Sequence, residues 1–168
     1  MIHNVSGDIL LSKAQLIGHG IAPNDDFKSG LAFALRERYP ALMKDFRHYC
    51  HTNHPKAGTT WVWSGVAEGG RSARVINLLT QEAAANKGDH PGGAHTEFVN
   101  KALHDLKKLV EKDKITSVAL PRLATGVGGL NWKDVEPLIK KVLGDLKIPV
   151  FVYTEYKKGV AATESGLK

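Results

Sequence analysis

The sequence lacks most of the features that mark secreted and membrane proteins. Its 168 residues include one cysteine, Cys50, so no disulfide can form within the chain. No apolar run approaches the roughly 20 residues that a membrane-spanning helix needs. Residues 1–8 contain no basic stretch followed by an apolar core, so there is no sign of a secretory signal. We therefore expect a cytoplasmic protein with no membrane partner.

Several common ligand signatures are also missing. Neither the dinucleotide fingerprint GxGxxG nor the phosphate-loop pattern GxxxxGK[ST] occurs. Three histidines near Cys50, namely His48, His51 and His54, suggest a zinc site at first sight. They are loosely spaced, however, and Pro55 indicates that their helix has already ended. We expect neither a metal nor a cofactor.

The charge leaves the kind of partner open. A formal net charge of +6 is compatible with an anionic partner such as a nucleotide or a nucleic acid. Most of the clustered lysines, however, fall on two predicted helices, where they are typical of solvated faces. The sequence shows no basic stripe interleaved with aromatic residues, which disfavours a dedicated nucleic-acid protein.

Strands and helices alternate along the chain. The spacing of apolar residues predicts helices over 30–38, 41–50, 96–112 and 132–143. Short apolar or alternating runs predict strands over 2–5, 15–18, 60–66, 74–79, 117–120 and 149–153, the third and fourth forming a hairpin. Strands separated by helices favour a sheet covered on both faces. The expected fold is a three-layer α/β/α sandwich with a mixed, mostly parallel sheet.

Two loops have the composition of an anion-binding site. Residues 24–30 join a strand to a helix, and residues 124–129 do the same further along the chain. Ligands of such folds lie at the carboxyl ends of the strands, where free N–H groups of helix N-termini favour anions. Glycines also let the backbone approach a phosphate closely. A diphosphate is the expected guest, although turn chemistry alone can explain either loop.

The order of these motifs resembles the macrodomain family. Gly7-Asp8-Ile9, a strand through His19, and Ser29-Gly30-Leu31-Ala32 are similar to its first half. Residues 120–132, with sequence LPRLATGVGGLNW, resemble its second phosphate segment, and residues 150–153 resemble its last strand. The resemblance covers about residues 1–156. Within the family, Pro121-Arg122 and Trp132 carry a similarity to one branch. That branch contains terminal ADP-ribose glycohydrolases, DNA-ADP-ribose-removing antitoxins and yeast ADP-ribose-phosphate phosphatase.

The resemblance implies that the chain binds ADP-ribose, either free or attached to a protein or nucleic acid. Asp8 would accept a hydrogen bond from the adenine amino group, with Ile9 beside it. The first loop would contact the distal ribose and one phosphate, and the second loop the other phosphate. Tyr153 would lie near the adenosine, or would simply fill the core. The implied ligand-binding residues are Asp8, Ile9, Ser29, Gly30, Leu31, Ala124, Thr125, Gly126, Val127, Gly128 and Tyr153.

The resemblance fails at the catalytic positions of the glycohydrolase subgroup. The subgroup's nucleophilic lysine corresponds to Gln81, and its partner aspartate to Gly128. An amide cannot form the covalent adduct that a lysine amine forms. Catalysis would then depend on a water molecule activated near His19, Asp25 or Asp26. Each of these has a plain alternative, since Asp25 and Asp26 can make loop hydrogen bonds or cap the helix and His19 can be a buried, hydrogen-bonded histidine.

Two further expectations concern segments outside these motifs. Residues 82–95 are long and rich in small residues, and they suit either a plain loop or a lid that contributes Lys87, Asp89 or His90. Residues 157–168 are small and polar, so we expect a disordered C-terminal tail after a domain of residues 1–156. The overall expectation is a monomeric ADP-ribosyl hydrolase. A non-catalytic ADP-ribose reader and an ADP-ribose 1″-phosphate phosphatase are the alternatives.

Overall fold

The computed structural model describes residues 1–66, 70–86, 89 and 91–167. Its centre is a six-stranded sheet in the order β1-β6-β5-β2-β4-β3. The strands are β1 (Ile2–Gly7), β2 (Leu16–Ile21), β3 (Thr60–Val66), β4 (Ser72–Leu79), β5 (Val118–Pro121) and β6 (Val150–Tyr156). All neighbouring pairs are parallel except β3 with β4. The expected mixed, mostly parallel sheet is confirmed.

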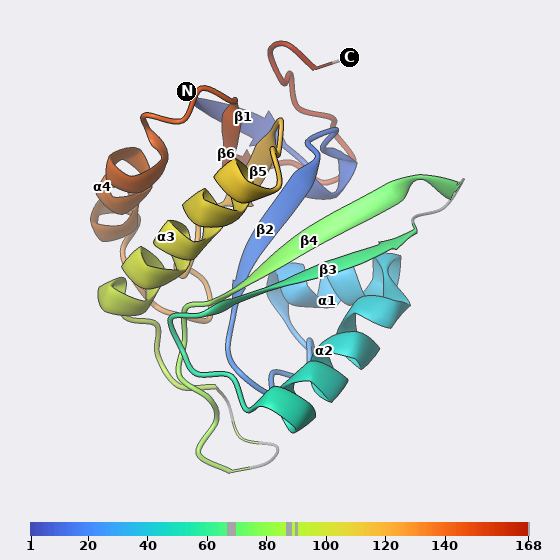
Figure 1. Ribbon diagram of the computed structural model, residues 1–168, viewed down its shortest axis with the longest axis vertical. Coiled ribbons are helices and arrows are strands. Elements are labelled where there is room, and N and C mark those ends of the chain that lie inside the picture. Colours follow the sequence, from blue (N-terminus) through green and yellow to red (C-terminus); the bar gives the residue numbers. More distant parts are fainter. Residues whose placement is uncertain (67–69, 87–88, 90, 168) are drawn as a thin grey trace.

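Helices cover both faces of the sheet (Figure 1). One face carries α1 (Gly30–Arg38) and α2 (Pro40–Asn53), and the other carries α3 (Thr96–Lys112) and α4 (Trp132–Leu143). A short 3-10 helix, η1 (Ile9–Leu11), follows β1. This is the three-layer α/β/α sandwich that the alternation of segments predicts. None of the described helices combines the length and apolarity needed to cross a membrane.

Each helix buries the apolar stripe that its sequence carries. In α3 the buried residues Val99, Ala102, Leu103, Leu106 and Val110 repeat at spacings of three and four, and they pack against β4, β5 and α4. On the opposite face, aromatic and aliphatic residues of α1 and α2 pack against β2, β3 and β4. Because two cores hold the sheet rigidly, the loops at its carboxyl edge have fixed starting points.

The C-terminal segment differs from the sequence-based expectation. Residues 157–167 were expected to be a disordered tail, but they lie against β1, η1 and the end of β6. The Glu164 carboxylate accepts hydrogen bonds from the Ser12 hydroxyl at 2.6 Å, the Lys13 N–H at 2.8 Å and the Tyr153 hydroxyl at 2.9 Å. Ala162 and Leu167 pack against the small core under β6. The composition of this segment did not reveal the long-range partners that hold it.

Candidate functional site

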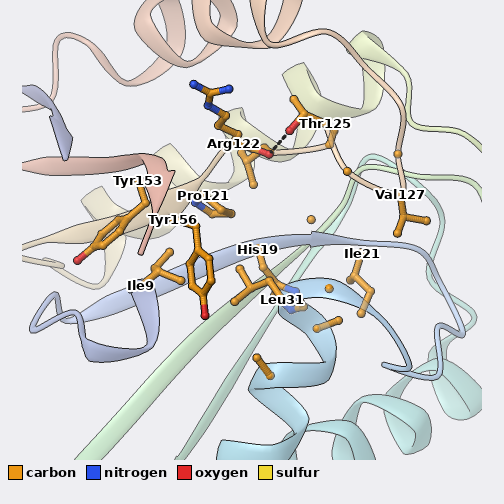
Figure 2. A pocket seen from close by; sticks show the side chains of 18 of the residues that line it. Ile9, His19, Ile21, Leu31, Pro121, Arg122, Thr125, Val127, Tyr153 and Tyr156 are labelled. Atoms are coloured by element: carbon orange, nitrogen blue, oxygen red, sulfur yellow. Dashed lines mark hydrogen bonds between the residues drawn. The ribbon is translucent and has the colours of Figure 1, made fainter. Parts of the chain in front are cut away.

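A cleft of about 590 Å³ lies at the carboxyl ends of the parallel strands, between the two glycine-bearing loops (Figure 2). Its volume is in the range usual for small-molecule sites. Twelve of the fourteen residues predicted for the site line it. They are Ile9, His19, Asp25, Ser29, Gly30, Leu31, Ala124, Thr125, Gly126, Val127, Gly128 and Tyr153. Asp8 and Asp26 are not part of the lining.

The first loop presents the N-terminus of α1 to this cleft. Ser29 holds the N-cap position with an extended backbone, but its side chain makes no capping bond. The Phe33 N–H is the first to find an acceptor in the helix, the Ser29 carbonyl at 3.2 Å. The N–H groups of Gly30, Leu31 and Ala32 therefore precede the helical hydrogen-bond ladder. Such uncapped donors, reinforced by the helix dipole, favour an anion in the cleft.

The second loop is closed by its own backbone. The Gly129 N–H donates to the Gly126 carbonyl at 3.1 Å, and the Leu130 N–H donates to the Ala124 carbonyl at 3.0 Å. The Thr125 hydroxyl donates to the Arg122 carbonyl at 2.9 Å (Figure 2). Among the described residues, nothing accepts from the N–H groups of residues 126–128. The loop thus offers backbone donors opposite those of α1.

Gly128 occupies a position with no room for a side chain. A Cβ atom there would lie 2.7 Å from the Ala124 carbonyl oxygen and 2.8 Å from the Ala94 Cβ. The Gly128 carbonyl also accepts a hydrogen bond from the Ala94 N–H at 3.0 Å, which holds the loop against residue 94. The aspartate that the resemblance leads one to expect at this position does not fit this backbone.

Gln81 lies at the wall of the cleft, at the position expected for the lysine nucleophile. Its side chain is buried, and its Nε2 donates to the Gly92 carbonyl at 3.2 Å. Gln81 also forms an isolated bridge with Ala94. The amide therefore ties the end of β4 to residues 92–94, which is a structural task.

His19 lies at the floor of the cleft and is 1% exposed. Its Nε2 is 2.6 Å from the Asn77 Oδ1, while the Asn77 amide donates to the Trp61 carbonyl at 3.1 Å. Because a carbonyl oxygen can only accept a hydrogen bond, Nε2 carries the proton and Nδ1 is unprotonated. Burial lowers the pKa of His19 to about 4, against a small opposing effect of the Asn77 hydrogen bond. At neutral pH this side chain is therefore uncharged and poorly suited to carry a proton.

The two aspartates of the first loop differ in place and environment. Asp25 lines the cleft, and its Oδ1 accepts the Phe27 N–H at 2.8 Å. Burial raises the pKa of Asp25, although the bond from Phe27 opposes that change. Asp26 instead pairs with Lys28 at 3.3 Å, and its half-exposed side chain lies outside the lining. Of the two, only Asp25 is placed to act on a ligand.

Asp8 is buried and turned toward the backbone rather than the cleft. Its carboxylate accepts from the Leu10 N–H at 3.0 Å and from the Gly159 N–H at 2.9 Å. The Asp8 N–H donates in turn to the Val160 carbonyl at 2.7 Å. The carboxylate thus joins η1 to the C-terminal segment. A contact with adenine would have to use a remaining lone pair of these oxygens or displace Gly159.

Two tyrosines of β6 line the cleft, and only Tyr153 was among the predicted residues. Tyr153 is 5% exposed, and its hydroxyl is engaged with Glu164; burial raises its pKa far above the ordinary value. Tyr156 is 62% exposed, and its side chain lines the cleft beside Ile9 (Figure 2). A register shift between β1 and β6 leaves Thr154 without a partner in β1. Thr154 is an extra residue in β6, and beyond it the side chains change face. The simple alternation of a strand therefore could not identify Tyr156 as a cleft residue.

Of the three loop residues that the sequence offered, only Asp89 is described by the structure. Lys87 and His90 lie outside the described residues, and Asp89 accepts a hydrogen bond from the Asn86 amide without lining the cleft. The helix predicted to end at Cys50 continues to Asn53, with Cys50 buried. No group of three or more His, Cys, Asp or Glu side chains within the described part of the chain is arranged to hold a metal.

Comparison with known families gives a match to the Macro domain over residues 21–139. Among curated relatives, a DNA ADP-ribosyl transferase-DNA ADP-ribosyl glycohydrolase fusion protein of Thermosipho africanus is 24% identical over 93% of this chain. A DNA ADP-ribosyl glycohydrolase of Mycobacterium tuberculosis is 27% identical over 81% of it. The chain spans 42% and 37% of the length of these two relatives. An ADP-ribose 1″-phosphate phosphatase of Candida albicans is 19% identical, with 84% of this chain and 93% of the relative aligned.

Solved structures have the same fold. The macrodomain of Thermus aquaticus DarG aligns with a TM-score of 0.76 at 22% identity, covering 92% of this chain and 98% of that one. Thermosipho africanus DarTG, solved in complex with ADP-ribose, aligns with a TM-score of 0.77 at 21% identity, covering 95% of this chain and 42% of that one. At these identities the likeness concerns the arrangement of helices and strands.

Proposed function

Because the chain belongs to the Macro domain family, we propose that it binds ADP-ribose, or an ADP-ribose group carried by a larger molecule, in the cleft between its two glycine-bearing loops. The observation that carries this proposal is the convergence of unused backbone N–H groups from the start of α1 and from residues 126–128 on one cavity. A diphosphate is the chemical group that such opposed donors favour.

The two ends of the cleft suit the two ends of this ligand. Tyr156 and Ile9 offer an apolar and aromatic surface for adenine near β1. Asp25, His19 and the N-terminus of α1 line the other end of the cleft. The distal ribose would lie there, beyond the diphosphate. The relatives named as a DNA ADP-ribosyl glycohydrolase and an ADP-ribose 1″-phosphate phosphatase support the same ligand class.

We further propose hydrolysis without a covalent lysine intermediate. Gln81 and Gly128 remove that route, and the low pKa of His19 removes an obvious proton carrier. Asp25 keeps Oδ2 free of hydrogen bonds to described residues and can take a proton from a water molecule that attacks the anomeric carbon. The bond from that carbon to its substituent breaks, and the released proton passes to the leaving atom.

A non-catalytic reader is the second candidate. It is favoured by a specific observation: a side chain cannot be accommodated at residue 128, and the amide at residue 81 is occupied by Gly92. Such a protein would hold the ADP-ribose group and leave its linkage intact.

Calorimetric titration with ADP-ribose tests the binding proposal. We expect a dissociation constant in the micromolar range, and Asp8→Ala should weaken binding by about 1–3 kcal/mol because the hydrogen bonds that hold η1 and Gly159 beside the cleft are lost. Lys108→Ala, on the exposed surface of α3, is the matched control and should leave binding unchanged. Absence of a heat signal from the unaltered protein would refute the proposal, and normal binding by Asp8→Ala would show that the anchor of η1 is not needed for binding.

Incubation with three substrates separates enzyme from reader. ADP-ribosylated protein, ADP-ribosylated DNA and ADP-ribose 1″-phosphate are followed for release of ADP-ribose or phosphate. Turnover that falls at least tenfold in Asp25→Asn, with ADP-ribose affinity retained, is the expected result for the hydrolase. Binding without turnover on any substrate would leave the reader as the function, and release of phosphate alone would indicate the phosphatase.

A further inference from the structure

Glu164 belongs to the C-terminal segment and does not line the cleft, yet it is bonded to a strand that does. Its Oε2 accepts from the Ser12 hydroxyl at 2.6 Å and from the Tyr153 hydroxyl at 2.9 Å, and its Oε1 accepts from the Lys13 N–H at 2.8 Å. None of the ion pairs among the described residues includes Glu164. The carboxylate is therefore held by three directional bonds from neutral donors and not by a counter-ion.

The C-terminal segment holds the short helix η1 at both of its ends. Asp8 is the residue before the helix, and its carboxylate accepts from the Gly159 N–H at 2.9 Å. Ser12 is the residue after the helix, and its hydroxyl donates to Glu164. A 3-10 helix of three residues has too few internal hydrogen bonds to fix its own place. The bonds to Gly159 and Glu164 therefore help to set where η1 lies.

The same segment lies directly against the end of β1. The Lys157 N–H donates to the Gly7 carbonyl at 3.0 Å. A Cβ atom at Gly7 would lie 2.8 Å from both the Ala162 nitrogen and the Val160 carbonyl oxygen. Gly7 lines the cleft, so the segment packs closely against the wall of the cleft.

The two elements that Glu164 joins form one end of the cleft. Ile9 of η1 and the β6 residues Tyr153 and Tyr156 line this end, away from the second loop (Figure 2). The side chains of Ser12 and Tyr153 are buried, and a buried hydroxyl without a hydrogen-bond partner is unfavourable. Loss of the carboxylate would oblige both hydroxyls to find new partners, and η1 would lose a bond that holds it against β6.

We propose that Glu164 is a positioning residue for the cleft: it fixes η1 against β6 and thereby sets the gap that receives the adenine of the bound ligand. The identity of that ligand rests on the proposed function, whereas the link between η1 and β6 does not. Because all three donors are neutral, the role is geometric, and any group that satisfies the donors in place can fill it.

Glutamine is such a group and alanine is not. The glutamine oxygen can accept from the Lys13 N–H, while its amide donates to the hydroxyls of Ser12 and Tyr153, since a hydroxyl can accept as well as donate. Alanine leaves all three donors without their acceptor. The two substitutions at Glu164 therefore remove the same charge but differ in whether they keep the geometry.

Calorimetric titration with ADP-ribose compares these variants. Glu164→Ala should weaken binding about tenfold, because this end of the cleft is no longer held. Glu164→Gln should keep the affinity within about threefold of the unaltered protein. Glu155→Ala is the matched control, because it removes the same charge from β6, where the carboxylate accepts from the Ser6 hydroxyl outside the cleft lining. It should change the affinity less than about twofold.

Amide hydrogen exchange provides a readout that needs no ligand. In Glu164→Ala, the N–H groups of residues 11 and 12, which are bonded within η1, should exchange roughly tenfold faster. Those of residues 129 and 130, bonded within the second loop, should not change. A general loss of stability would speed both sets alike. Ser12→Ala removes only the bond at the end of η1 and should show the same pattern, which keeps the test decisive if Glu164→Ala does not fold.

Three outcomes would overturn the proposal. The first is equal weakening of binding by Glu164→Ala and Glu164→Gln, which would mean that the charge matters and not the geometry. The second is an unchanged affinity in Glu164→Ala, and the third is exchange that rises equally in η1 and in the second loop. If the unaltered protein releases no heat with ADP-ribose, the proposed function fails, and the exchange measurement alone decides whether Glu164 fixes η1.

Discussion

The two loops that border the cleft have similar compositions but are built differently. In the first loop, Gly30 has a φ of +60° and open space around the position of a Cβ atom. In the second, Gly128 has an ordinary φ, but its surroundings leave no space for a Cβ. One glycine is therefore required by backbone conformation and the other by packing. The comparison shows that a glycine in a ligand loop does not reveal its physical role until its neighbours are known.

The largest effect is expected from Gly128→Asp, which supplies the carboxylate of the glycohydrolase subgroup. The new side chain collides with Ala94 and Ala124, so unfolding free energy should fall by about 1–3 kcal/mol and ADP-ribose binding should be lost. Thermal unfolding and calorimetry measure both. Gly126→Ala is the control for stability, because nothing lies within 4 Å of its Cβ position. A stable Gly128→Asp protein that binds ADP-ribose would show that the second loop is as open as the first.

A smaller effect is expected from Gly30→Ala. The added methyl meets no atom, but a left-handed conformation costs a residue with a Cβ roughly 1–2 kcal/mol. Denaturant unfolding should show a loss of about 1 kcal/mol, with ADP-ribose binding weakened only as far as the start of α1 shifts. If Gly30→Ala lowered the free energy of unfolding as much as Gly128→Asp does, the proposed difference between the two loops would be wrong.

The smallest effect on stability is expected from the aspartates of the first loop. Burial raises the pKa of Asp25, so its native state binds a proton more readily than its unfolded state, and the ionised form is disfavoured at neutral pH. Asp25→Asn keeps an acceptor for the Phe27 N–H and should be as stable as the unaltered protein or slightly more so at pH 7. This difference should shrink as the pH falls through the pKa of Asp25.

Asp26→Asn provides the comparison within the same loop. It removes an exposed pair with Lys28, which should cost less than about 0.5 kcal/mol in denaturant unfolding. A marked loss of stability at pH 7 in Asp25→Asn, larger than that in Asp26→Asn, would contradict the view that burial disfavours the charged Asp25.

Much of the layer structure was predictable from local patterns. The bounds of α1, α3, α4 and β3 coincide with the predicted ranges, because apolar spacing and helix-ending residues are local signals. β1, β2 and β6 extend beyond their predicted ends, since pairing with a neighbouring strand continues past the apolar run.

Local patterns indicated where the cleft lies, but not every side chain that lines it. Both loops could be found because glycine, serine and threonine between a strand and a helix are visible in the sequence. Tyr156 was missed because a one-residue irregularity in β6 redirects it. Asp8 was assigned to adenine, yet its carboxylate is engaged by Gly159, a residue of the segment expected to be disordered. These contacts join residues about 150 positions apart, for which local patterns carry no signal.

The amino-acid sequence by itself determined the alternation of strands and helices and the apolar faces that form the cores on the two sides of the sheet. Only the tertiary structure decided that Gly128 cannot carry a side chain and that burial keeps His19 uncharged. The physical reason is the range of the interactions. Propensity and periodicity act within a few residues, whereas steric exclusion and desolvation depend on which distant segments the fold brings together.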